Sequence, residues 1–168
     1  VDQAVELFVD RALLTGPHAP EPGIIEEIVS RLDRLPLAIE LAASRTGLLG
    51  VVALAERLSQ GLDALSVPQR GVPARHSTLR ATVDWSWQLL SPWEARALAQ
   101  LSVFRAGFSL AAVDEVVLPG DGRSGFEAVA ALVERSLVRA VQGAEPRFDL
   151  YEPVRELAAE RLEDQDTV

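Results

Sequence analysis

The sequence contains no cysteine, methionine, lysine or asparagine, and only two of its 168 residues are histidines. Without cysteine the chain can form neither a disulfide nor a thiolate metal site. His18 and His76 have no carboxylates at metal-ligand spacing, and one histidine cannot build a zinc site. No metal ligand and no catalytic residue are therefore predicted.

All 16 basic residues are arginine. Together with the missing lysine, asparagine and methionine, this is typical of codon use in a GC-rich genome. The chain starts directly in helical periodicity and has no initiator methionine. These features predict a portion of a longer protein.

Long apolar runs and a leader-like start are also missing. Charges interrupt every apolar stretch well before the roughly 20 residues that a membrane span needs. The start has no basic region followed by an apolar one, as a signal peptide would have. A net charge of −9 disfavours binding to anionic membrane surfaces. A cytoplasmic protein without membrane contact is predicted.

Apolar residues make up 48% of the chain, enough for a real core. The most informative stretch is Arg31–Ala43, where Pro36 lies at the N-terminus of a very apolar predicted helix. Proline has no N–H to lose at the first helical position, and its φ suits a helix there. Because apolar side chains cover most of the helix circumference, a buried helix is predicted.

Helical periodicity predicts a small bundle over residues 1–65, with helices at 2–14, 22–33, 36–44 and 51–60. Residues 66–77 have no helical period and contain Pro68, Gly71 and Pro73, so they are predicted to be an interdomain linker.

The pattern of helices and strands over residues 78–168 predicts a second domain. Ser91-Pro92-Trp93-Glu94 predicts a capped helix start, because Glu94 can bond back to Ser91 in a capping box. Further helices are expected at about 109–117, 125–135 and 152–163. Strands at 137–141 and 147–151, joined by a loop with Gly143 and Pro146, read as a hairpin. The predicted fold class is mainly α, a small helical bundle followed by a winged-helix domain with one β-hairpin.

Five segments in order resemble one family, the STAND or NB-ARC type of ATPase module found in large bacterial, notably actinobacterial, transcriptional regulators. The resemblance is to the C-terminal part of that module. The segments are 31–43, 78–94, 101–108, 132–138 and 148–158.

The resemblance implies a nucleotide-dependent signalling switch. Residues 1–65 would be its first helical domain, with the GLPL motif, and 78–168 its winged helix. Both would close over ADP or ATP, with Mg²⁺, held by an upstream P-loop domain that is absent from this sequence. Downstream TPR-like repeats and self-association would follow. The chain itself would hold no cofactor and would not be an enzyme, whereas the longer protein would be an ATPase.

The same resemblance assigns nucleotide-facing positions. The GLPL proline, which packs by the adenine, corresponds to Pro36, with Leu35 and Leu37 beside it, and Arg34 replaces the usual glycine. Leu150-Tyr151-Glu152 falls where relatives have Met-His-Asp, so Tyr151 replaces the histidine that approaches phosphate. The alternatives are that Pro36 only starts a helix and that Tyr151 only packs at the end of the wing.

Two other functions stay open, a DNA-binding winged-helix transcription factor domain and an adaptor that binds only protein. DNA readers need basic patches. The predicted helix at 125–135 is net acidic, and in the hairpin Arg139 and Arg147 balance Glu145 and Asp149. No direct DNA contact is therefore expected from this region.

Overall fold

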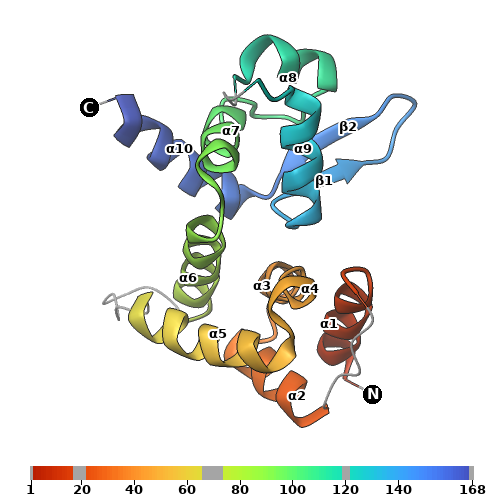
Figure 1. The fold of residues 1–168 in the computed structure, drawn as a ribbon, viewed down its shortest axis with the longest axis vertical. Coiled ribbons are helices and arrows are strands. Elements are labelled where there is room, and N and C mark those ends of the chain that lie inside the picture. Colours follow the sequence, from red (N-terminus) through yellow and green to blue (C-terminus); the bar gives the residue numbers. More distant parts are fainter. Residues whose placement is uncertain (1, 17–21, 66–73, 119–121, 167–168) are drawn as a thin grey trace. The chain divides into compact units, whose positions relative to one another are not determined.

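A computed structural model describes residues 2–16, 22–65, 74–118 and 122–166 (Figure 1). The chain divides into two compact units, Val1–Gln88 and Leu89–Val168. Within the described ranges, none of the helices combines the length and apolar character of a membrane span. Among the same residues, no three histidine, cysteine or acidic side chains are grouped so as to hold a metal ion.

The first unit is all-helical. It contains α1 (Gln3–Leu13), α2 (Pro22–Arg31), α3 (Pro36–Ala43), α4 (Thr46–Leu49), α5 (Val51–Leu65) and α6 (Ala74–Gln88). Helix α3 is central, because it packs against both α1 and α6. Ala38, Ile39 and Leu41 are fully buried. Pro36 occupies the start of α3, as the sequence predicts.

The turn between α2 and α3 contains two consecutive residues in the left-handed region, Asp33 at φ 51° and Arg34 at φ 56°. This conformation costs an L-residue roughly 1–2 kcal/mol. Contacts from both sides hold the turn. Arg34 pairs with Asp2, the N-cap of α1, and the Asp33 carboxylate accepts a 2.7 Å hydrogen bond from Thr78 Oγ1 of α6.

The division between the units differs from the predicted one. The linker was expected at 66–77, but residues 74–77 belong to α6, and residues 66–73 lie outside the described ranges. Helix α6 packs on α3 and α5, which places it in the first unit. Ala81, Val83 and Trp85 of α6 are buried. This packing could not be predicted from the sequence, because α6 lacks a clear apolar stripe.

The second unit contains α7 (Pro92–Leu101), α8 (Leu110–Val116), α9 (Gly125–Glu134), β1 (Val138–Val141), β2 (Arg147–Leu150) and α10 (Glu152–Asp166). Helix α7 packs against α8, α9 and α10, and α9 packs on β1 (Figure 1). The two strands form an antiparallel hairpin. The predicted winged-helix order of three helices, a hairpin and a final helix is confirmed.

The predicted capping box is present at the start of α7. Glu94 Oε2 accepts hydrogen bonds from the Ser91 N–H at 2.8 Å and the Ser91 hydroxyl at 2.7 Å. Glu94 as a whole is 2% exposed, and its other carboxylate oxygen accepts a 2.8 Å bond from Arg135 Nε at the end of α9. Glu94 therefore caps α7 and also joins it to α9.

Candidate functional site

Helices α8 and α9 pack at very close range. A Cβ atom on Gly125 would lie only 2.7 Å from Val113 Cγ1 and 2.8 Å from Asp114 Oδ1. Ser124 caps α9, because its hydroxyl oxygen accepts a 3.2 Å bond from the Glu127 N–H. These contacts fix the start of α9 against α8.

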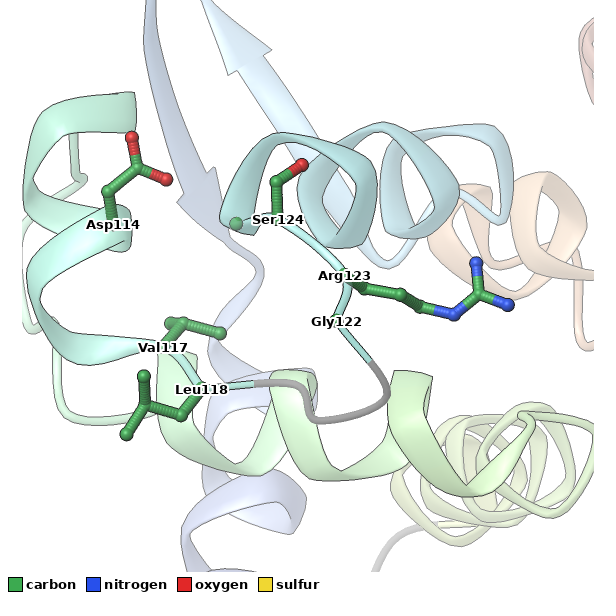
Figure 2. A pocket seen from close by; sticks show the side chains of 7 residues that line it. Asp114, Val117, Leu118, Gly122, Arg123 and Ser124 are labelled. Carbon is green, nitrogen blue, oxygen red and sulfur yellow. The ribbon is translucent and has the colours of Figure 1, made fainter.

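A groove of about 370 Å³ opens where α8 ends and α9 begins (Figure 2). Its lining combines Val117 and Leu118 with the charged Asp114 and Arg123. The Asp114 carboxylate points toward the start of α9, while the Arg123 side chain extends away from it (Figure 2). The Arg123 guanidinium lies 4.4 Å from the centre of the Trp93 ring. Arg123 therefore ties the loop before α9 to α7.

The solvent-facing side of α9 is apolar and acidic. Phe126 is 61% exposed, and Glu127 and Glu134 are exposed on the same helix. Hydrogen bonds from the backbone and hydroxyl of Ser124 hold the pKa of Glu127 below its usual value. No arginine occurs between Gly125 and Glu134. The exposed side of α9 is thus negatively charged at neutral pH.

The hairpin, by contrast, exposes arginine. Successive strand residues point to opposite faces, and Arg139 pairs with Asp149 while Val141 pairs with Arg147. The opposite face is turned inward, since Val138 and Leu150 are each only 2% exposed. We call the outward side the outer wing face; it consists of Arg139, Val141, Arg147 and Asp149.

Phe108 anchors the hairpin to the rest of the domain. Its N–H donates to the Phe148 carbonyl at 2.7 Å, and its carbonyl accepts from the Phe148 N–H at 2.8 Å, which forms a single antiparallel bridge. Its ring lies 6.2 Å from that of Phe148 and 5.1 Å from that of Phe104. Arg147 Nη2 also donates to the Gly107 carbonyl at 3.4 Å. The segment with exposed Arg105 therefore adjoins the outer wing face.

Asp149 is shared between two arginines. Its carboxylate accepts from Arg139 Nη2 at 3.1 Å and from Arg155 Nη2 of α10 at 2.8 Å. Burial raises the pKa of Asp149, but these hydrogen bonds and one from the Leu150 N–H bring the pKa below its ordinary value. Two guanidinium groups therefore face this carboxylate, and Arg155 also pairs with Glu152 through Nε at 3.3 Å.

Tyr151 lies between β2 and the start of α10, and it is half-buried. The Arg139 guanidinium is 5.1 Å from the centre of its ring, within the range of a cation–π contact. Glu152 is the first residue of α10, where its negative charge interacts favourably with the helix dipole. Tyr151 thus has a packing role in the wing, and its contact with phosphate stays a prediction.

Leu35, Pro36 and Leu37 lie in the first unit. Pro36 is exposed and both leucines are half-buried. Arg34, which stands where the GLPL motif has glycine, has a positive φ of 56°. Glycine adopts this conformation without a Cβ penalty. A glycine at position 34 would therefore fit this backbone with less strain than arginine does.

Residues 90–163 match the winged helix-turn-helix domain family. The chain is 39% identical over 171 residues to a predicted HTH-type transcriptional regulator of Mycobacterium tuberculosis and to one of Mycobacterium bovis. The match covers 97% of this chain but 19% of each regulator. It is 35% identical to an uncharacterised protein of Mycobacterium tuberculosis, covering 96% of this chain and 43% of that protein.

These similarities correct one expectation. The sequence argument predicted no direct DNA contact, from the acidic balance of the 125–135 helix and the hairpin. The winged helix-turn-helix match and the regulator relatives point instead to DNA contact. Charge counted along the sequence was a poor guide, because it did not separate the side chains of the hairpin that face solvent from those paired within the fold.

Proposed function

We propose that this chain is part of a DNA-binding transcriptional regulator and that its winged helix-turn-helix domain contacts DNA. The observation that carries the proposal is the α7–α8–α9–hairpin arrangement with exposed arginines on the hairpin. The named regulator relatives support it. The chain spans about a fifth of the length of those regulators, so the proposal concerns one component of a longer, cytoplasmic protein.

Electrostatics limits how this domain can bind. Residues 89–168 contain six more acidic than basic residues. Phosphate contacts supply essentially all of non-specific DNA affinity and arise from local arginine and lysine side chains. Binding by this acidic domain must therefore come from a few grouped arginines, and we expect modest affinity with few phosphate contacts.

The test is DNA binding at several salt concentrations. A labelled random-sequence duplex is titrated with the chain between 25 and 200 mM NaCl, and the dissociation constant is read from fluorescence anisotropy. We expect the logarithm of affinity to fall linearly with the logarithm of salt, by about 0.9 for each phosphate contacted. Arg31→Ala in α2, outside the winged helix, is the matched control and is expected to bind equally. No binding at the lowest salt would refute the proposal.

A second function, the nucleotide-dependent switch, is favoured by one observation. The ring of exposed Pro36 carries no donor, and half-buried Leu35 and Leu37 lie beside it, so this helix start offers an apolar surface that suits the face of an adenine base. On this proposal the chain is not an enzyme. A P-loop domain elsewhere in the longer protein holds ADP or ATP with Mg²⁺, and this chain closes over that nucleotide. In the closed state Tyr151 faces phosphate. That movement gates self-assembly or transcription.

Calorimetry separates this second function from a protein-only adaptor. We expect micromolar or tighter ADP binding by the longer protein and none by this chain alone, because the sequence contains no phosphate-binding loop. Tight binding by the chain alone, or none by the longer protein, would contradict the switch.

A further inference from the structure

We infer that the outer wing face, together with Arg105, rather than the exposed side of α9, carries the DNA contact of this domain. The inference rests on the proposed function and specifies which surface performs it. In many helix-turn-helix proteins the second helix lies in the major groove. The charges of this domain favour a different surface.

The exposed side of α9 is unsuited to the DNA groove. With α9 in a DNA groove, Glu127 and Glu134 would lie near the phosphates, and like charges repel. Phe126, at 61% exposure, offers no hydrogen bond to a base edge. The arginine and amide side chains that read guanine and adenine are absent from Gly125–Glu134.

The outer wing face has the opposite character. The side chain of Arg139 is 50% exposed, and Arg147 is exposed as well. Arg139 lies opposite Asp149, so Arg147 is its diagonal neighbour across the hairpin. Diagonal neighbours are about 7–8 Å apart at the backbone, and phosphates along one DNA strand rise by about 3.4 Å each. Two long arginine side chains at this spacing can reach two phosphates of one strand.

The surrounding structure holds these arginines in place. Arg139 donates to Asp149, and Arg155 donates to both Asp149 and Glu152, so these four side chains hold one another in place. Phe108 fixes the outer edge of β2 by two backbone hydrogen bonds to Phe148. The Arg147 bond to the Gly107 carbonyl keeps the hairpin beside the segment that bears Arg105. Binding through this surface is directed at phosphates, and α9 contributes little sequence discrimination.

Matched double variants of the whole chain test the inference. R105Q/R147Q removes two wing charges, whereas E127Q/E134Q removes two charges from α9. We expect the wing variant to lower the salt slope of DNA binding by about two and to weaken binding equally on duplexes of different sequence. We expect the α9 variant to keep the wild-type salt slope.

A variant that keeps the positive charges distinguishes an effect of charge from an effect of misfolding. R105K/R147K is expected to restore the salt slope, because a phosphate contact needs the charge rather than the guanidinium. An unchanged slope for the wing glutamine variant, or a changed slope for the α9 variant, would overturn the inference and leave the proposed function standing. Absence of DNA binding by the wild-type chain would instead overturn the proposed function itself.

Discussion

Replacing Phe108 with alanine is expected to lower the free energy of unfolding of the winged helix by about 3–5 kcal/mol, as for other buried phenylalanines cut to alanine. Phe108 is 1% exposed, and its ring lies near the rings of both Phe104 and Phe148. Its loss leaves a cavity under the hairpin and weakens the support of the outer wing face. Urea denaturation followed by tryptophan fluorescence measures the change.

The control for this prediction is Phe108→Leu, which keeps most of the buried volume. We expect it to cost less than half as much as the alanine variant, because a smaller cavity remains. Under native conditions the leucine variant should keep the DNA affinity of the wild type. Equal stability of the alanine variant and the wild type would show that Phe108 does not anchor the hairpin.

Replacing Glu94 with alanine is expected to cost about 2–3 kcal/mol of unfolding free energy. Breaking a buried ion pair costs about 3–5 kcal/mol, but the side chain of Arg135 is 30% exposed, so water compensates part of its lost partner. The loss of the α7 cap adds to the cost. For a domain of this size the melting temperature should fall by roughly 10–20 °C, which a thermal melt followed by circular dichroism measures.

Glu127→Ala is the matched control, because Glu127 holds the same capping-box position in α9 but is exposed. We expect it to cost at most about 1 kcal/mol. Comparable losses for both variants would mean that capping, rather than the pair with Arg135, explains the effect of Glu94.

The effect of Glu94 also depends on pH. Burial raises the pKa of Glu94, but hydrogen bonds from Arg135 and Ser91 outweigh it and bring the pKa below 4.5. The stabilisation is therefore fully present above pH 4.5 and disappears as the pH falls through the lower, folded-state pKa. The difference in stability between wild type and Glu94→Gln should be constant near neutral pH and shrink in acid.

Local signals made much of the fold predictable. The capping box at Ser91 and Glu94, and the proline at the start of α3, act within one helical turn and can be read directly. The same holds for the hairpin, because its turn residues separate two short strands. The order of these elements was enough to predict the winged helix.

The boundary between the units could not be read in this way. Helix α6 has no apolar stripe, and its place in the first unit depends on packing against α3 and α5. The left-handed turn at Asp33 and Arg34 was also missed. Arginine does not favour that conformation, and the contacts that hold the two residues come from Asp2 and Thr78, which are distant in sequence.

The sequence by itself determined the element types, the absence of cysteine and the surplus of acidic residues. Tertiary structure decided which charges face solvent. Strand register placed Arg139 and Arg147 on one face, and Arg155, from the next helix, met Asp149 there. A charge count along the chain treats every side chain alike, whereas electrostatic recognition depends on which charges are exposed and which are already paired. That difference made the predicted absence of DNA contact wrong.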